Sequence, residues 1–333
     1  MEQVYERKKY MAGDITKKQK QLFAMVQAAN SIAILGHIHP DGDCVGATLG
    51  LYNYLSENYK GKTIQVYMEG FAPCFKFLSG TRKVKHEALE THYDLAISVD
   101  VADKKRLGKF EEIFNNAISA ACIDHHVSNK GFGDFCYVDA TASSACEVLC
   151  DLMDEDKISE KTANCLFTGI VHDTGVFKYT NTSRKTMVIA GMLIEKGAKA
   201  DSIIDDTFYK KTFKQNQLMA RVVMDATLYE GGKIIVGIAS KDTFKEFKCT
   251  TMDTEGIVEQ LRLTDGVEVA AFAYQLNKTT YKFSLRAKHY ADVNKIAQKF
   301  GGGGHIKAAG FETEEDIEKA VEKFLKEVKK QLK

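Results

Sequence analysis

Several short apolar runs in this chain end directly in acidic or imidazole side chains, and this arrangement constrains the fold more than any other feature. The first run, residues 31–35, leads into residues 36–43, which read Gly-His-Ile-His-Pro-Asp-Gly-Asp. An apolar run followed by Pro and Gly predicts a buried strand that ends in a turn, and the pattern from Val45 to Asn58 predicts the helix that follows. By itself, segment 36–43 fits a plain turn as well as a metal site, because Asp-Gly is a common turn dipeptide.

Three further apolar runs follow, separated by helix-length segments, and two of them repeat this arrangement. They span residues 62–68, 93–99 and 118–123. Such alternation predicts a parallel sheet with helices on both faces. The run 93–99 ends in Asp100, and the run 118–123 ends in Asp-His-His at residues 124–126. Since ligands of open α/β sheets bind at the carboxyl ends of the strands, these polar residues are expected where a ligand-binding or catalytic site usually lies.

The remainder of the chain predicts a helical connector and a second, smaller domain. Helices are expected at residues 1–30, 144–153, 159–171, 183–196 and 201–209. Beyond these, paired strands are expected at residues 226–238 and 267–286, and helices at 254–262, 292–300 and 314–330. The predicted fold class is therefore α/β, with an N-terminal parallel-sheet domain, a helical connector and a smaller C-terminal α+β domain. We expect these three parts to span residues 1–185, 186–217 and 218–333.

Charge and cysteine content exclude several classes of protein. Lys and Arg number 46 against 45 Asp and Glu, so the chain lacks the basic field that holds long nucleic acids. Its eight cysteines form no C-x-x-C pair, which indicates reduced thiols and a cytoplasmic protein. No apolar run approaches the roughly 18 residues of a membrane span, so no membrane association is expected.

The polar side chains at the predicted strand ends form one constellation of carboxylates and imidazoles. Its members are His37, Asp41, Asp43, Asp100, Asp124, His125, His126 and, after a helix, Asp173. Converging carboxylates raise one another's pKa values, and two divalent cations remove that repulsion. A mixed set of His and Asp without Cys favours Mn²⁺, with Mg²⁺ or Co²⁺ as alternatives, over a closed structural zinc site. Asp124 also fits a carboxylate that orients a ligating imidazole.

Five segments, in order along the chain, carry a resemblance to a known family. They are residues 36–43, Ser-Val-Asp at 98–100, Asp-His-His at 124–126, His-Asp-Thr-Gly at 172–175, and Phe-Gly-Gly-Gly-Gly-His at 300–305 with Ala-Ala-Gly at 308–310. The chain resembles the DHH/DHHA1 phosphoesterases, and among them the branch of oligoribonucleases that also dephosphorylate 3′-phosphoadenosine 5′-phosphate. The resemblance covers residues 31–310, which is nearly the whole chain.

The resemblance implies a role for each position that matches a family motif. The implied metal ligands are His37 and Asp41 for one cation, Asp43, His125 and Asp173 for the other, and Asp100 as a bridge between the two. His126 would face the scissile phosphate, and Asp100 and Asp124 would complete the catalytic set with it. The nucleophile would be a metal-bound hydroxide, without a covalent enzyme intermediate.

The glycine segment and the resemblance together indicate substrate contacts. The bare amides of four consecutive glycines at residues 301–304 can wrap an anion, and neither a helix nor a packed strand suits them. His305 would add a donor at the start of a following helix. The further implied contacts are Arg262, Arg286, Gly302, Gly303, Gly304, Ser143 and Ser144. Each arginine could instead be a surface residue, and Ser143 and Ser144 are equally good helix caps.

These features predict a Mn²⁺-dependent phosphoesterase that cleaves very short RNA to mononucleotides and converts 3′-phosphoadenosine 5′-phosphate to AMP. Its partners would be short RNA and small nucleotides, not long duplexes or membranes. The sequence neither predicts nor excludes a homodimer. A cyclic di-AMP or pApA phosphodiesterase is the nearest rival. A single-strand DNA exonuclease usually has an additional domain that this length does not accommodate, and a non-catalytic sensor would lack a metal ligand. The glycine segment argues against an inorganic pyrophosphatase.

Overall fold

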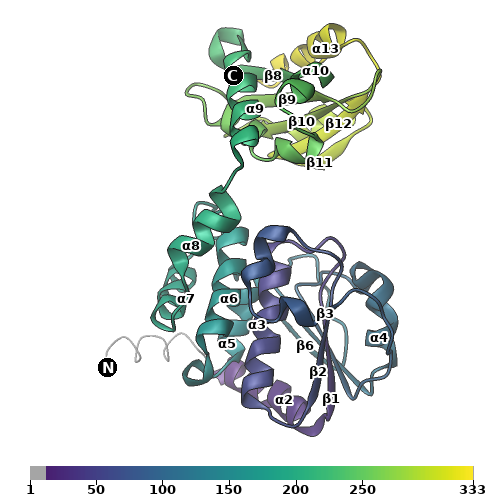
Figure 1. The fold of residues 1–333 in the computed structure, drawn as a ribbon, viewed down its shortest axis with the longest axis vertical. Coiled ribbons are helices and arrows are strands. Elements are labelled where there is room, and N and C mark those ends of the chain that lie inside the picture. Colours follow the sequence, from purple (N-terminus) through teal and green to yellow (C-terminus); the bar gives the residue numbers. More distant parts are fainter. Residues whose placement is uncertain (1–12, 333) are drawn as a thin grey trace. The chain divides into compact units, whose positions relative to one another are not determined.

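The computed structural model describes residues 13–332, which form two compact units (Figure 1). The first unit ends at Lys210 and the second begins at Lys211. The helix expected over residues 1–30 is present as α2 (Gly13–Ala28), and the earlier part of that prediction lies outside the described residues. Every helix within the described range is too short or too polar to span a bilayer.

A six-stranded parallel sheet forms the centre of the first unit. In spatial order its strands are β3 (Val84–Lys85), β2 (Thr63–Tyr67), β1 (Ser31–Leu35), β4 (Leu95–Val99), β5 (Ser119–Asp124) and β6 (Phe135–Val138). The four strands predicted from apolar runs are confirmed, whereas β3 and β6 are too short to form such a run. The chain moves outward from β1 to β3 and returns to β4 on the other side of β1. The strand order therefore reverses between β1 and β4, and open α/β sheets bind ligands at such a switch point.

Helices cover both faces of this sheet, as predicted (Figure 1). On one face lie α2, α3 (Gly42–Asn58), α5 (Ala145–Leu152) and α6 (Glu160–Asp173), and on the other lies α4 (Glu111–Asn116). The helices α7 (Arg184–Glu195) and α8 (Ala200–Ile204) pack against α6, and a π-helical turn, Asp205–Tyr209, follows α8. Successive side chains of a strand point to opposite faces. Ile34 of β1 packs in the core beneath α3, α5 and α6, and Leu35 packs in the core beneath α4. The N-terminal domain is therefore a helix-covered parallel sheet.

A mixed six-stranded sheet forms the centre of the second unit. In spatial order its strands are β11 (Gly303–His305), β12 (Ala308–Thr313), β10 (Tyr281–Ala287), β9 (Val269–Gln275), β8 (Ile234–Ala239) and β7 (Thr227–Tyr229), and only β8 and β9 are parallel. Its helices are α9 (Phe213–Met224), α10 (Lys241–Glu246), α11 (Ile257–Arg262), α12 (Val293–Gln298) and α13 (Ile317–Lys329). One apolar core lies between the sheet and α12 and α13, and another lies between it and α9 and α11.

The glycine segment, residues 301–304, differs from the expectation that it forms no strand and leads into a helix at His305. Part of it forms β11, an exposed edge strand paired with β12, and no helix follows His305. The facing residues of β12 are Ala308, Ala309 and Gly310, so the two backbones can approach closely. A Cβ atom on Gly302 would lie 2.2 Å from the carbonyl oxygen of Gly310. Glycine is required here by close packing between strands, which the composition of the segment alone did not reveal.

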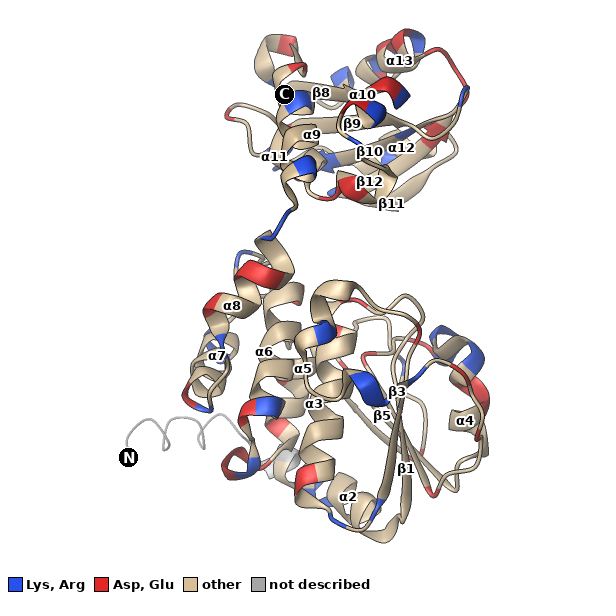
Figure 2. Cartoon of the chain, in the orientation of Figure 1, with Lys and Arg blue, Asp and Glu red and all other residues tan. Residues whose placement is uncertain are grey.

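Acidic and basic residues are interspersed on both units (Figure 2). This distribution agrees with the nearly equal totals of 46 basic and 45 acidic residues. Attraction of an anionic ligand must therefore come from local groups rather than from the field of a whole domain.

Candidate metal centre

The switch point of the parallel sheet brings together the six residues predicted to bind cations. His37 follows β1, Asp100 follows β4, and His125 follows β5. Asp41 and Asp43 lie at the start of α3, and Asp173 ends α6. Residues separated by up to 136 positions along the chain thus meet because parallel strands present their carboxyl ends at one edge of the sheet.

Asp100 occupies the middle of this cluster. Its Oδ2 lies 3.4 Å from Nε2 of His37, and its Oδ1 lies 3.5 Å from Nε2 of His125. The residue is 2% exposed, yet Oδ1 accepts no hydrogen bond from the described residues. Its backbone is left-handed, with φ +61°, a conformation that costs energy for a residue other than glycine. Asp100 is thus a buried carboxylate, held between two imidazoles, with one oxygen free of hydrogen bonds.

Asp43 is bound by the amino terminus of α5. Its carboxylate accepts hydrogen bonds from the backbone N–H groups of Ala145 (2.6 Å) and Cys146 (3.1 Å). Burial raises the pKa of Asp43 well above its usual range, and the nearby charges of Asp100 and Asp173 raise it further. A cation beside Asp43 would remove this penalty on the charged form.

Asp41 serves as the amino-terminal cap of α3. Its Oδ1 accepts hydrogen bonds from the backbone N–H groups of Asp43 and Cys44, both 3.1 Å long. The same oxygen lies 3.9 Å from Nε2 of His37. Capping fixes the carboxylate at the mouth of the cluster, where its side chain is largely exposed.

His125 and Asp173 form the other side of the cluster. Nε2 of His125 lies 3.3 Å from Oδ2 of Asp173 and 3.8 Å from Oδ2 of Asp43. Burial lowers the pKa of His125, but the adjacent carboxylates of Asp100, Asp43 and Asp173 raise the pKa overall to about 10. Burial raises the pKa of Asp173 to about 7. Without cations, this cluster therefore retains protons that cations would displace.

The orientation of His37 is set by its other ring nitrogen. Nδ1 lies 2.7 Å from the carbonyl oxygen of Ile38 and 3.1 Å from Nη2 of Arg106. An N–H at Nδ1 that donates to Ile38 leaves no lone pair there to accept from Arg106, and it directs the lone pair of Nε2 at Asp100, which is the arrangement that a metal-binding imidazole needs. Sequence reasoning missed Arg106, because nothing in the run Lys-Lys-Arg at residues 104–106 distinguishes it from other basic surface residues.

Asp124 orients His126. Nδ1 of His126 donates to Oδ1 of Asp124 at 2.8 Å, and Nδ2 of Asn129 donates to Oδ2 at 2.7 Å. Asp124 is fully buried, whereas the side chain of His126 is 41% exposed. The hydrogen bond to Asp124 raises the pKa of His126. Both carboxylate oxygens are thus used, which agrees with the orienting role considered for Asp124.

His172 is separate from the ligand set, although it neighbours Asp173. Its Nε2 lies 2.8 Å from Oγ1 of Thr207, and its ring packs edge-on against Phe75 at a centroid distance of 5.0 Å. Burial lowers the pKa of His172 to about 4, so the ring is neutral. His172 therefore packs as an aromatic residue beneath the start of α3.

The donors of the cluster fit divalent cations. Three groups of side chains each have ligand atoms within 4.8 Å of one another. They are His37, Cys44 and Asp100; Asp100, His125 and His126; and Asp43, His125 and Asp173. The unpaired oxygen of buried Asp100 and the mutually repelling carboxylates are features that cations would satisfy. Cys44 is an addition to the set predicted from sequence.

The hydroxyls of Ser143 and Ser144 have structural partners. Oγ of Ser144 caps α5 by accepting from the N–H of Glu147, and Oγ of Ser143 donates to Oε2 of Glu147 at 2.6 Å. Both serines are fully buried. The helix-cap alternative is confirmed for Ser144. Contact of Ser143 and Ser144 with a substrate stays a prediction. These residues hold the helix terminus that binds Asp43.

The substrate-binding residues predicted in the second unit lie in and beside its sheet. Arg286 of β10 pairs across the sheet with Ala308 of β12, which pairs in turn with His305 of β11. Directly paired residues share a face, so Arg286 and His305 lie on the same face with only a small side chain between them. Arg262 ends α11 and forms an ion pair with Glu259.

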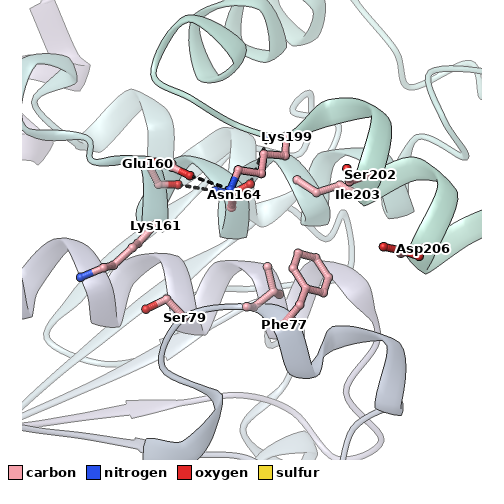
Figure 3. A pocket seen from close by; sticks show the side chains of 10 residues that line it. Phe77, Ser79, Glu160, Lys161, Asn164, Lys199, Ser202, Ile203 and Asp206 are labelled. Carbon is pink, nitrogen blue, oxygen red and sulfur yellow. Dashed lines mark hydrogen bonds and ion pairs between the residues drawn. The ribbon is translucent and has the colours of Figure 1, made fainter.

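A pocket elsewhere in the first unit is distinct from the cluster. It has a volume of about 270 Å³ and lies between α6, α8 and the segment around Phe77 (Figure 3). Its polar side chains bind one another: Asn164 accepts from the N–H of Lys199 at 3.0 Å, and Nζ of Lys199 lies 3.2 Å from Glu160. Asn164, Lys199 and Glu160 of this pocket therefore already have partners within the protein.

Comparison with known proteins agrees with the two-domain fold. The family model "DHH family, N-terminal domain" matches residues 31–170, and the "DHHA1 domain" model matches residues 231–333. A probable bifunctional oligoribonuclease and PAP phosphatase NrnA of Streptococcus mutans is 31% identical over 92% of this chain and 99% of its own length. The chain belongs to the DHH/DHHA1 family.

Two further relatives and one solved structure extend this comparison. The bifunctional oligoribonuclease and PAP phosphatase NrnA of Bacillus subtilis is 29% identical over 87% of this chain and 91% of its own length. The cyclic-di-AMP phosphodiesterase PdeA of Listeria monocytogenes is 26% identical over 86% of this chain but only 45% of its own length. The crystal structure of an exopolyphosphatase-related protein from Bacteroides fragilis has the same fold, with a TM-score of 0.83 and 24% identity over 95% of this chain and 96% of that one.

Proposed function

We propose that this chain is a metal-dependent phosphoesterase that hydrolyses short oligoribonucleotides to mononucleotides and 3′-phosphoadenosine 5′-phosphate to AMP. The observation that carries the proposal is Asp100, a buried carboxylate that faces an imidazole on each side and keeps one oxygen without a hydrogen bond. Two cations sharing one carboxylate typically lie roughly 3.5–4 Å apart in phosphoesterases. The activities for which the NrnA relatives are named support the choice of substrates.

The residues that would hold the cations fall into two sets joined by Asp100. We assign His37 and Asp41 to one cation, and Asp43, His125 and Asp173 to the other. Mn²⁺ suits such a mixture of imidazole and carboxylate ligands, with Mg²⁺ and Co²⁺ as alternatives. When bound, the pair would acidify a water molecule and neutralise charge on the phosphate oxygens.

The protein supplies orientation and a proton donor. His126 is held by Asp124 at Nδ1, which leaves Nε2 to face the substrate. A protonated imidazole there can donate to a phosphate oxygen as negative charge develops on it. The backbone amides of α5 fix Asp43, so the ligand geometry is set by the fold before substrate binds.

Substrate binding would be the role of the second unit. Arg286 and His305 lie on one face of its sheet, beside the bare backbone of Gly303 and Gly304, and we assign the terminal nucleotide phosphate to this surface. We place the catalytic domain at residues 1–185, the connector at 186–217 and the substrate-binding domain at 218–333. We also propose a cytoplasmic location, because the eight cysteines of the sequence form no C-x-x-C pair.

Hydrolysis of cyclic di-AMP or pApA is the second candidate function. It uses the same phosphodiester chemistry, and the PdeA relative is named for it. That relative is more than twice as long as the matched region, which makes the NrnA-type substrates the better-supported choice.

A substrate panel with added Mn²⁺ distinguishes these functions. It compares RNA of two to five nucleotides, 3′-phosphoadenosine 5′-phosphate, cyclic di-AMP, pApA and pyrophosphate, with products separated by chromatography. We expect turnover of the short RNA and of 3′-phosphoadenosine 5′-phosphate to exceed that of the cyclic dinucleotide. Preference for cyclic di-AMP would replace the proposal with its rival.

The Asp100→Ala variant tests the chemistry itself. Loss of the carboxylate shared by both cations should lower kcat/KM by more than about 100-fold, which is the upper range for loss of a group that merely supports a metal ligand. Steady-state kinetics with saturating Mn²⁺ measure the effect, and circular dichroism confirms that the variant is folded. Near-normal turnover by folded Asp100→Ala would refute the two-cation assignment.

A further inference from the structure

A buried thiol lies beside the donors assigned to the first cation. Cys44 belongs to the first turn of α3, and its Sγ accepts a hydrogen bond from the backbone N–H of His37 at 3.3 Å. A Cβ atom on Gly36 would lie 2.7 Å from this sulfur, so the glycine leaves the space that the thiol fills. The thiol is therefore packed against the end of β1, where the cluster begins.

Sulfur, nitrogen and oxygen donors converge at this point. Cys44, a ring nitrogen of His37 and a carboxylate oxygen of Asp100 lie within 4.8 Å of one another, and all three residues are buried. The carboxylate oxygen of Asp100 on this side of the cluster is Oδ2, which lies 3.4 Å from Nε2 of His37. Zinc binds Cys sulfur at about 2.3 Å and His nitrogen at about 2.0–2.1 Å, so small side-chain movements suffice to bring such a trio onto one ion.

We propose that Cys44 acts as a thiolate ligand at the first cation position and, with His37 and Asp100, makes that position a binding site for Zn²⁺. The inference rests on the metal centre of the proposed function and adds a ligand to it. Thiolate selects Zn²⁺ over the harder Mn²⁺, whereas the second position contains only carboxylates and imidazole.

Binding would require the thiol to lose its proton to solvent. A zinc ion that forms a bond to sulfur replaces that proton, and its binding therefore strengthens as pH rises. No oxidant or other reactant is needed.

X-ray absorption spectroscopy of the full-length chain loaded with one equivalent of Zn²⁺ tests this inference directly. We expect one sulfur among the zinc ligands at about 2.3 Å, together with nitrogen and oxygen. This measurement uses the unaltered protein, so it holds even if a substitution disturbs folding. A zinc environment of nitrogen and oxygen only would overturn the inference.

Cobalt spectra of matched variants then assign the sulfur. Co²⁺ should give a thiolate-to-metal charge-transfer band with the unaltered chain and with Cys146→Ser, a second buried thiol that contacts the Asp43 backbone instead. The band should disappear in Cys44→Ser and Cys44→Ala. Zinc affinity, measured by chelator competition, should fall at least about tenfold in Cys44→Ser, since even groups behind a ligand contribute that much. A band that persists without Cys44 would contradict the assignment.

Mn²⁺ binding separates failure of this inference from failure of the proposed function. Electron paramagnetic resonance measures the free Mn²⁺ remaining as the unaltered chain is titrated. If Mn²⁺ binds and no sulfur is found around zinc, Cys44 is excluded while the metal centre stands. If Mn²⁺ does not bind, the metal centre of the proposed function fails, and this inference fails with it.

Discussion

At the scale of single residues, hydrogen bonds determine which nitrogen of each histidine can act. His126 donates through Nδ1 to Asp124, whereas His37 uses Nδ1 toward Ile38 and directs Nε2 at Asp100. Two imidazoles a short distance apart thus have different functions: one can donate a proton, and the other can offer a lone pair. The neighbour of each ring, rather than the residue type, makes this distinction.

Asp124→Asn tests the His126 assignment. The hydrogen bond from His126 to Asp124 raises the pKa of the imidazole, so the protonated form persists to higher pH. Replacing the carboxylate with an amide should lower that pKa and lower kcat by about 100-fold, within the range of general acid catalysis. The alkaline limb of the pH–rate profile should shift to lower pH, because the proton is lost earlier.

The matched control for this variant is Asn129→Ala, which removes the other hydrogen bond of Asp124 without touching the imidazole. It should have a smaller effect on kcat and leave the alkaline limb nearly unchanged. An unshifted pH profile in Asp124→Asn would exclude His126 as the proton donor. Mn²⁺ titration of both variants checks that metal binding is intact.

At the scale of secondary-structure elements, glycines allow α3 and α6 to approach closely and so bring their metal-binding ends together. A Cβ atom on Gly46 of α3 would lie 2.5 Å from the carbonyl oxygen of Cys165 and 2.8 Å from the backbone nitrogen of Gly169. These neighbours are backbone atoms of α6, which cannot rotate away. The separation of the two helices is therefore set by glycine, and with it the positions of Asp43 and Asp173.

Gly46→Ala should destabilise the fold by about 1–3 kcal/mol, which is the usual cost of overpacking a core. Gly191→Ala is the matched control, because Gly191 lies in helix α7 and a Cβ atom on it would have no neighbour within 4 Å. Alanine should stabilise that helix by up to about 1 kcal/mol. Denaturant unfolding measures the free energy of unfolding of both variants. Equal changes in the two would show that the close approach of α3 and α6 does not depend on glycine at position 46.

Lys185 of α7 forms ion pairs with two carboxylates of α5 and with Asp139, which precedes that helix. Its Nζ lies 2.5 Å from Asp151, 3.4 Å from Asp139 and 3.5 Å from Glu147. Lys185→Met should lower the free energy of unfolding by about 2 kcal/mol. This is less than the loss expected for a fully buried ion pair, because Lys185 is partly exposed. Burial raises the pKa of Asp151, and loss of the nearby lysine would raise it further. The destabilisation should therefore grow as pH rises above about 4, where this carboxyl group ionises in the unfolded chain.

Thermal unfolding from pH 4 to 8 measures this pH dependence. Lys199→Met is the control, because its ion pair with Glu160 is exposed and should contribute no more than about 1 kcal/mol. A pH-independent loss in Lys185→Met would mean that the lysine contributes by packing rather than by charge.

At the scale of the whole molecule, the proposed chemistry and the proposed substrate recognition lie in different units. The metal-binding cluster lies entirely within the first unit, and the Arg286–His305 face lies entirely within the second. This separation predicts that damage to the second unit weakens nucleotide binding without removing the reaction itself.

Arg286→Ala tests this division. It should raise KM for 3′-phosphoadenosine 5′-phosphate about tenfold or more, the typical effect of losing a charged hydrogen bond to phosphate. Hydrolysis of a small activated phosphodiester should be largely unchanged, because that substrate lacks the second phosphate. Arg221→Ala is the control, since Arg221 is already paired with Asp225 and Glu246. Equal loss on both substrates would remove Arg286 from recognition.

Local sequence patterns were sufficient to predict the four main strands and the polar side chains at their ends. An apolar run identifies a buried strand because burial depends on the residues themselves, and a carboxylate after the run must emerge at the end of the sheet. The structure accordingly brings the six predicted ligands together. Strands β3 and β6 could not be predicted from apolar runs, because each is stabilised by its neighbour in the sheet rather than by its own composition.

Tertiary structure decided the features that depend on residues far apart in the chain. Such contacts account for the reversal of strand order next to β1, the burial of Ser143 and Ser144, and the pairing of Gly303 and Gly304 with β12. So does the approach of Cys44 to Asp100, which lies 56 positions away in the sequence. The sequence alone determined which groups are available for chemistry, whereas packing decided which of them meet, because a side chain's partners are set by the elements that fold against it.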